Sequence, residues 1–243
     1  MKLAGQLVAV EDVTAGERAA MFALMDRHYA NVSRDVFERH LAEKRWVIRL
    51  AREDTGELCG FSTQMLLDVE VDGRPIKALF SGDTIIDRRC WGDHALMLAG
   101  GQLAVKLIDE HPFEELYWFL ISAGYKTYRF LPVFFRQFYP RYDQPTPPAA
   151  MRVLDSLARG KFGRRYARGV VCADDWQYRL RDGIAELSAE RLSDPHVRFF
   201  AGSNPGHVQG DELCCLARLE WDNFTAAAVR VLGRAGRGPL EAG

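Results

Sequence analysis

The feature that most constrains the fold is a strand, a tight turn and a helix that follow one another in the middle of the chain. The apolar run 78–86 predicts a buried strand, and 95–108 predicts a helix with apolar residues on one face. The turn between them begins with Arg88 and Arg89 and contains Gly92. Because backbone N–H groups converge at the N-terminus of a helix, a turn of this kind forms an anion site. The sequence therefore predicts a phosphate-bearing cofactor and, with it, a group-transfer enzyme.

The first 143 residues carry the pattern of a mixed α/β core. Strands are expected over 6–10, 46–51, 58–71, 76–86 and 115–122, and helices over 16–29, 36–44, 95–108 and 126–138. Pro132 should kink or divide the last helix. Asp72 and Gly73 predict a tight hairpin between the two long strands. The expected fold class is α/β, with a mixed central sheet of about seven strands and helices on both faces.

The composition changes at the sequence Gln-Pro-Thr-Pro-Pro, residues 144–148, which predicts a linker or a stiff turn. We expect residues 144–192 to form a helical insertion, with helices over 149–166 and 174–192. Residues 193–243 should complete the same domain as residues 1–143. Their expected elements are strands over 197–201 and 212–219 and a helix over 223–232.

Composition limits the classes of partner. The formal net charge of −1 over 243 residues gives no reason to expect a nucleic-acid or membrane partner. The five cysteines are an odd number with no CxxC pair, which favours a reduced, cytoplasmic protein. The six histidines show no HExxH pair and no metal-ligand spacing, so no metal site is expected.

The order of elements, with Arg89-Cys90-Trp91-Gly92 after the fourth strand, resembles the GNAT superfamily of acyl-CoA-dependent N-acyltransferases. The phosphate loop of that family reads Arg or Gln, two variable residues, Gly, a variable residue, then Gly or Ala. Arg89 and Gly92 match this pattern, and His94 stands at its last position. The resemblance covers residues 6–141 and the final strands. The alternative is a purely structural strand–helix turn in which Asp93 caps the helix.

The resemblance implies that acetyl-CoA or another acyl-CoA binds here, with a carrier-bound phosphopantetheine as the alternative donor. The pantetheine arm would lie where the fourth and fifth strands separate, and Gly82 is compatible with a bulge that starts this separation. The residues expected to contact the donor are Thr84, Ile85, Ile86, Arg88, Arg89, Cys90, Trp91, Gly92, Asp93 and His94.

Aminolysis of a thioester needs a base for the amine and an acid for the leaving thiolate. Asp83 lies on the fourth strand, close to the expected acyl group, and is the candidate base; the alternative is a hydrogen-bonded structural aspartate. The family often places a tyrosine on the helix after the fifth strand, where it acts as the general acid for the thiolate. The nearest position in this chain is Phe135, so Tyr128 and Tyr139 become the candidate acids.

These features predict an acyltransferase that moves an acyl group from a pantetheine thioester to an amine of a small molecule or a protein. The missing tyrosine and the residues Asp93 and His94 support the alternative, a catalytically silent binding or structural module with the same fold. The aromatic stretch 113–142 and a basic run suggest a third hypothesis, that the protein is a carrier-protein-dependent enzyme of secondary metabolism. The basic run, which could meet an acidic acyl carrier protein, consists of Arg159, Lys161, Arg164, Arg165 and Arg168.

Overall fold

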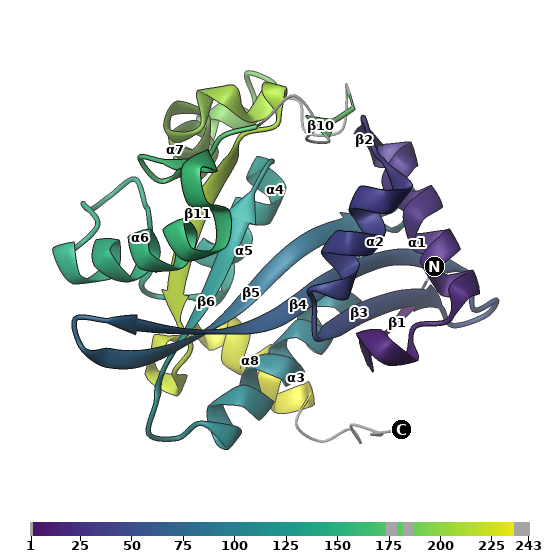
Figure 1. Ribbon diagram of the computed structural model, residues 1–243, viewed down its shortest axis with the longest axis horizontal. Helices are drawn as coiled ribbons and strands as arrows, with labels where there is room; N and C mark the ends of the chain where they lie inside the picture. The colour runs from purple at the N-terminus through teal and green to yellow at the C-terminus, as the bar shows by residue number, and fades with distance from the viewer. Residues whose placement is uncertain (1, 174–178, 182–186, 236–243) are drawn as a thin grey trace.

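The computed structural model describes residues 2–173, 179–181 and 187–235, and a mixed sheet runs through it (Figure 1). Nine strands of the described residues form this sheet, in the order β1-β3-β4-β5-β6-β11-β9-β8, with β7 paired to β11. Their bounds are β1 (Leu3–Ala9), β3 (Trp46–Arg52), β4 (Leu58–Val71), β5 (Arg74–Ile86), β6 (Glu115–Ser122), β7 (Phe138–Tyr139), β8 (Tyr166–Ala167), β9 (Val170–Val171) and β11 (Glu212–Arg218). The expected α/β class with a mixed sheet is confirmed.

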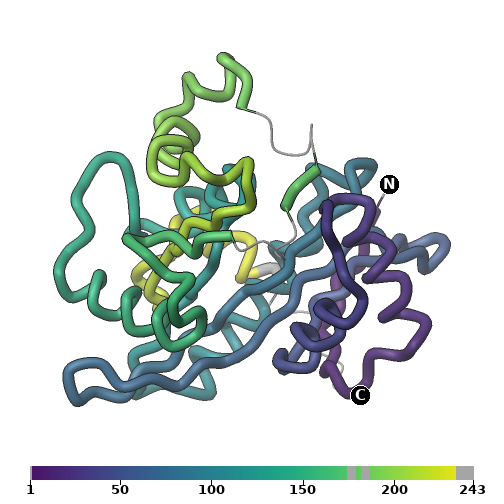
Figure 2. Tube along the Cα trace, turned by 45° about the horizontal axis from the view of Figure 1, so that its top comes forward, coloured from purple at the N-terminus to yellow at the C-terminus, as the bar shows by residue number. Residues whose placement is uncertain are grey.

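The long hairpin β4–β5 crosses the whole molecule, as its blue trace shows in Figure 2. Asp72 and Gly73 both have positive φ, 54° and 74°, which suits the tight turn that joins antiparallel strands. β5 and β6 are parallel, whereas the other described strand pairs are antiparallel. Since parallel neighbours need a crossover connection, helix α3 (Ala95–Glu110) links them.

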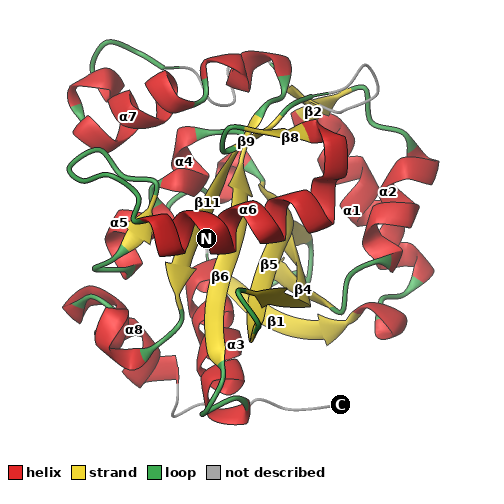
Figure 3. Ribbon diagram, turned by 60° about the vertical axis from the view of Figure 1, so that its left-hand side comes forward, coloured by secondary structure: helices red, strands yellow, loops and turns green. Residues whose placement is uncertain are grey.

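Helices cover both faces of the sheet. On one face α1 (Ala15–His28) and α2 (Arg34–Ala42) pack on Val47, Phe61 and Ile85, and α6 (Pro148–Phe162) lies across the sheet on Phe80 and Phe119 (Figure 3). On the other face α3 and α8 (Ala226–Ala235) share an apolar cluster with residues of β5, β6 and β11. The alternation of apolar side chains along the strands therefore supplies two cores.

Shorter elements complete the chain. A separate two-stranded sheet joins β2 (Tyr29–Ala30) to β10 (Arg179–Leu180). Further helices are α4 (Tyr125–Tyr128), α5 (Phe130–Phe134) and α7 (Pro195–Ser203), with short 3-10 turns η1 (Val10–Asp12), η2 (Arg88–Cys90), η3 (Gly163–Arg165), η4 (Arg191–Ser193), η5 (Pro205–Gln209) and η6 (Trp221–Asn223). Throughout the described ranges, every helix is too short or too polar to cross a membrane.

Three predicted elements are wrong or incomplete. The strand expected over 197–201 belongs to α7, because Asp194 caps a helix with Pro195 in its first turn. The helix expected over 126–138 is divided into α4 and α5, and the chain is extended after α5. The division lies close to Pro132, which was expected to kink or divide this helix. Within 174–192, residues 179–180 form a strand; 174–178 and 182–186 lie outside the described residues.

The proposed division at 143 and 192 stays a prediction. Helix α6 lies in the expected insertion, and the same stretch also adds β8 and β9 to the main sheet. β11 then pairs with β6 along six residues, so the last third of the chain shares the sheet of the first two thirds.

Helix α3 offers a test of how firmly the crossover is packed. Leu107 is fully buried in the cluster between α3, α8 and the sheet. Leu107→Ala should lower the free energy of unfolding by about 2–5 kcal/mol, because it removes buried methyl groups and leaves a cavity. Urea denaturation measures this change. Leu98→Ala, at a 36% exposed position of the same helix, is the control; a comparable loss there would contradict the assigned packing.

Candidate functional site

A β-bulge marks the point where β5 and β6 separate. β5 pairs with β6 from Ile76 with Glu115 as far as Ser81 with Leu120, and it continues to Ile86 without this neighbour. On its other edge, the register with β4 shifts by one residue just beyond Ser81, so Gly82 and Asp83 together lie opposite Thr63. The bulge that was expected at Gly82 is therefore present.

Close contacts explain the glycine at the bulge. A Cβ atom on Gly82 would lie 2.8 Å from Thr63 Oγ1 and 2.9 Å from Lys44 Cε. A larger residue would displace both side chains. Gly82 thus allows the hydroxyl and the lysine stem to approach the backbone at the place where the sheet opens.

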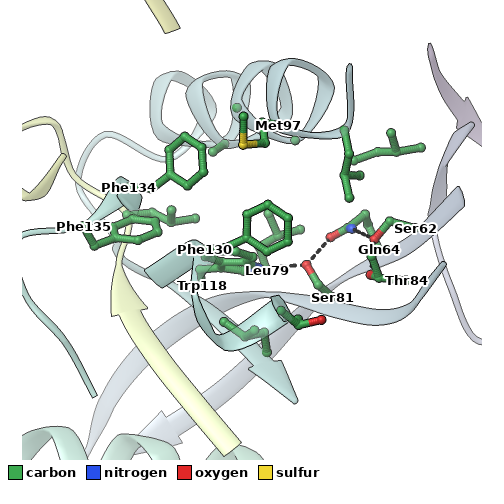
Figure 4. Close-up of a pocket in the computed structure, with 18 of the residues that line it drawn as sticks. Ser62, Gln64, Leu79, Ser81, Thr84, Met97, Trp118, Phe130, Phe134 and Phe135 are labelled. Atoms are coloured by element: carbon green, nitrogen blue, oxygen red, sulfur yellow. Dashed lines mark hydrogen bonds between the residues drawn. The ribbon is translucent and has the colours of Figure 1, made fainter. Parts of the chain in front are cut away.

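A cavity of about 110 Å³ lies on the α3 face of this opening (Figure 4). Its walls are mainly apolar and come from α3, α5 and α8, with Met97, Phe130 and Phe134 among them. Its floor is polar and comes from β4 and β5. The polar side chains on this floor are Ser62, Gln64, Ser81 and Thr84.

These floor residues form a continuous chain of hydrogen bonds with Trp118. The indole Nε1 donates to Ser81 Oγ at 2.8 Å, and Ser81 Oγ donates to Gln64 Oε1 at 2.7 Å. Gln64 Nε2 donates to Ser62 Oγ at 2.8 Å, and that hydroxyl shares a 2.7 Å bond with Thr84. Because buried polar groups are costly without partners, this chain holds a fixed polar strip inside an apolar cavity.

Asp83 points to the opposite face of the sheet, where its charge acts on His40 of α2, on Lys44 just after α2 and on Tyr29 of β2. Burial lowers the pKa of Lys44 and of His40, and the charge of Asp83 opposes both shifts. Burial, with smaller contributions from the charges of Glu212 and Asp83, raises the pKa of Tyr29. The bulge therefore has a cavity on one side and a charged group around Asp83 on the other.

Lys44 is held directly over the bulge. Its Nζ donates to the carbonyl of His40 at 2.9 Å and lies 6.0 Å from the ring centroid of Phe80. Lys161 of α6 lies 5.8 Å from the same centroid and forms an ion pair with Glu43.

The hydroxyl Thr63 Oγ1, which the Gly82 contact brings close to Lys44, is fully buried. Across the described part of the chain it finds no hydrogen-bond partner. A donor or acceptor of a bound molecule could complete it.

Several charged side chains of the turn after β5 already form hydrogen bonds or ion pairs within the protein. Arg89 donates from its backbone and its guanidinium to Asp87 and also to Glu57 Oε1 at 2.9 Å, and these bonds raise the pKa of Arg89. Asp93 Oδ1 accepts the N–H of Ala95 at 2.7 Å, so a carboxylate of the protein already satisfies one donor of the first turn of α3.

The remaining residues expected to contact the donor lie around this turn. Thr84 lines the cavity, whereas Ile85 packs under α1 and α2 and Ile86 packs near Leu3 and Cys59. Cys90 is buried, and Trp91 is exposed beside Arg88. Gly92 has φ +95°, and His94 is the N-cap residue of α3 without a side-chain cap bond.

The candidate tyrosines lie outside the cavity. Tyr128 is fully buried against Phe138 and Phe200, and its hydroxyl donates to the carbonyl of Pro140 at 3.0 Å. Tyr139 lies in β7, paired with Leu216. Phe135 lines the cavity, and its ring packs on Trp118. The structure thus does not bring either tyrosine to Asp83 or to the cavity floor.

Several site residues were missed by sequence reasoning. Ser62 and Gln64 are the clearest, since two polar residues with period-two spacing inside an apolar strand indicate one polar stripe. Lys44 and Trp118 gave no such signal, because their roles depend on strands and helices that are distant in sequence. In the described ranges, no group of three or more His, Cys, Asp or Glu residues could hold a metal ion.

Among known proteins, solved structures give partial matches to this chain. Neither models of protein families nor curated proteins give a match to the sequence. A protein of unknown function from Enterococcus faecalis, a probable N-acyltransferase, is 13% identical with a TM-score of 0.44; the match covers 59% of this chain and 38% of that chain. The match therefore spans well under half of the Enterococcus protein.

Two named enzymes are similar in the same way. Glucosamine-6-phosphate N-acetyltransferase from Arabidopsis thaliana is 15% identical with a TM-score of 0.31, over 49% of this chain and 82% of that one. A GNAT family N-acetyltransferase from Escherichia coli, solved in complex with CoA, is 14% identical with a TM-score of 0.35, over 54% and 69%. Both matches are partial and have low sequence identity and low TM-scores.

The bulge can be tested through its glycine. Gly82→Ala should lower the free energy of unfolding by about 1–3 kcal/mol, because the new methyl group displaces Thr63 and Lys44. Gly160→Ala in α6 is the matched control, since its methyl group would meet no atom within 4 Å. The control should be neutral or stabilising. Equal losses of unfolding free energy in the two variants would show that the close contact at Gly82 does not exclude a larger residue.

The turn after β5 makes a pH-dependent prediction. The hydrogen bond from Arg89 is the main cause that lowers the pKa of buried Asp87. Because the folded-state pKa lies below the unfolded value of about 3.9, this stabilisation is present above that pH and is lost as pH falls through the folded-state pKa. Asp87→Asn should cost about 1–3 kcal/mol near neutral pH.

Urea unfolding of both proteins across the acid range checks this, and the difference should shrink as pH falls through the folded-state pKa of Asp87. Asp109→Asn, which changes an exposed carboxyl group of α3, is the control and should have little effect at any pH. A difference for Asp87→Asn that stays constant with pH would contradict the ion pair as its cause.

Proposed function

We propose that this protein is an acyltransferase that moves an acyl group from a pantetheine thioester to an amine of a small molecule or a protein. The observation that carries the proposal is the opening between β5 and β6 at the Gly82 bulge. It has a narrow cavity on one face and the group around Asp83 on the other. Two reactants could therefore meet at one opening from opposite sides.

The cavity fits the arm of a pantetheine donor. Apolar walls bury the methylene and methyl groups of such an arm. The strip from Ser62 to Trp118 offers hydroxyl and amide groups for its two amide bonds. Acetyl-CoA or another acyl-CoA is the proposed donor, and phosphopantetheine on an acyl carrier protein is the alternative.

Asp83 is the proposed general base. In the reaction the acceptor ammonium loses a proton to a base, its nitrogen attacks the thioester carbon, the C–N bond forms, and the C–S bond breaks. The attacking nitrogen gives up a second proton as the amide forms, and the leaving sulfur takes up a proton to become a thiol, so one proton in total is left on the base. Asp83 lies on the face opposite the cavity, where its charge acts on Lys44 and His40.

The orientation of Tyr128 and Tyr139 favours a second candidate function. Neither hydroxyl lies at the cavity, and Tyr128 is hydrogen-bonded within the core. A module that binds the donor without transferring its acyl group would have the same cavity and the same bulge. Turnover distinguishes it from an enzyme.

Replacement of the proposed base tests the function. Asp83→Asn should lower kcat/KM for amine acylation by about a hundredfold, because the amide cannot accept the proton. Its affinity for CoA should not change, since Asp83 lies on the face away from the cavity. Thiol release from acetyl-CoA and longer acyl-CoAs, with a panel of amines over a range of pH, provides the measurement.

Asp68→Asn is the matched control, because Asp68 is on the neighbouring strand β4 and pairs with Lys77 far from the bulge. It should keep the wild-type rate. An unaltered pH–rate profile in Asp83→Asn would remove Asp83 as the base. Binding of CoA with no thiol release from any donor would favour the silent module.

A further inference from the structure

Trp91 forms the centre of a cationic cluster at the surface. Its side chain is 43% exposed, and its indole N–H donates to the carbonyl of Ile86 at 2.9 Å, which fixes the ring at the end of β5. Lys126 Nζ lies 3.1 Å from the ring centroid, and Arg88 Cζ lies 5.7 Å from it. The aromatic face stabilises these cations close to each other.

Arg191 of η4 brings a third positive charge to this place. Burial lowers the pKa of Lys126, and the charges of Arg191 and Arg88 lower it further. Burial and both neighbouring positive charges thus all disfavour the charged form of Lys126. Within the described ranges, Arg88 and Arg191 form no ion pair with a carboxylate. An anion bound here would therefore offset repulsion between like charges.

The cluster lies beside the cavity. β5 and β6 are parallel, so the segments that follow them, with Trp91 after β5 and Lys126 in α4 after β6, meet at the same end of the sheet. Thr84, Leu96 and Thr127 line the cavity, and each is close in sequence to one of these two segments. An anion held by the cluster would lie next to segments that line the cavity.

We infer that Arg88, Lys126 and Arg191 bind the phosphate group of the pantetheine donor, in place of Arg89 and the N-terminus of α3. The inference rests on the proposed function, since it takes the donor to be a pantetheine thioester. Arg89 is already bonded to Asp87 and Glu57, and Asp93 accepts the first N–H of α3. Arginine and lysine suit phosphate because they form short, charge-assisted hydrogen bonds with its oxygens.

Calorimetric titration with a series of probes tests the inference. The probes are pantetheine, 4′-phosphopantetheine, dephospho-CoA, CoA and inorganic pyrophosphate. The variants Arg88→Gln, Lys126→Gln and Arg191→Gln should each raise the Kd of phosphopantetheine about tenfold, as loss of one charge-assisted hydrogen bond predicts. The Kd of pantetheine should not change. Exposed Arg191 is the variant least able to disturb folding.

Two control variants sharpen the comparison. Arg89→Gln should change the Kd of phosphopantetheine less than about twofold, since its guanidinium is already paired. Lys106→Gln, at an i,i+4 surface pair of α3, controls for net charge. The inference is overturned if Arg89→Gln weakens phosphopantetheine binding as much as the three cluster variants do. It is also overturned if the cluster variants weaken pantetheine binding as much as phosphopantetheine binding.

The probes also separate the two sources of phosphate. Equal affinity for CoA and phosphopantetheine would support a site for the phosphate that both donors share, as a carrier protein requires. Tighter binding of CoA that dephospho-CoA loses would support a site that also holds the 3′-phosphate of CoA.

The failure of this inference can be told apart from the failure of the proposed function. Acyl transfer with wild-type Kd values in all three cluster variants would refute the inference and leave the function intact. Pyrophosphate binding that the variants lose, without any acyl transfer, would refute the function and support the anion site. Absence of binding by every probe would refute both.

Discussion

The parallel pairing of β5 with β6, and its end at Ser81, is the constraint on which the rest of the site depends. Parallel strands need a crossover helix, and this requirement places α3 across one face of the sheet. The bulge at Gly82 and Asp83 then shifts the register with β4. Since the two strands part at this point, the sheet has an opening in its middle, where a continuous sheet would leave no room for a ligand.

The bulge also decides which side chains face which reactant. Ser81 and Thr84 both point to the α3 face although they are three positions apart, because the extra residue resets the alternation. Asp83 consequently points to the α2 face, toward Lys44 and His40. One inserted residue therefore provides both the polar floor of the cavity and the charged group opposite. A regular strand would have put Thr84 and Ser81 on opposite faces.

Much of the core fold could be predicted from local sequence. The strands 58–71 and 115–122 match their predicted bounds, because long apolar runs between turn residues leave little choice of conformation. The strand predicted over 197–201 failed because a cap at Asp194 and Pro195 outweighs its β-branched and aromatic content. Tyr128, a candidate acid, does not reach the cavity, because it lies on a short helix that turns its ring into the core.

The sequence by itself determined the order of the main strands and helices as far as β6, the hairpin at Asp72 and Gly73, and the position of the bulge, because these follow from apolar periodicity and from residues with special backbone freedom. Only the tertiary structure decided how the charges are used. Arg89 is paired with Glu57, just before β4, whereas Lys126 and Arg191 come from later segments and their charges interact beside Trp91. Such contacts join residues far apart in the chain, so their chemistry depends on packing that no local pattern records.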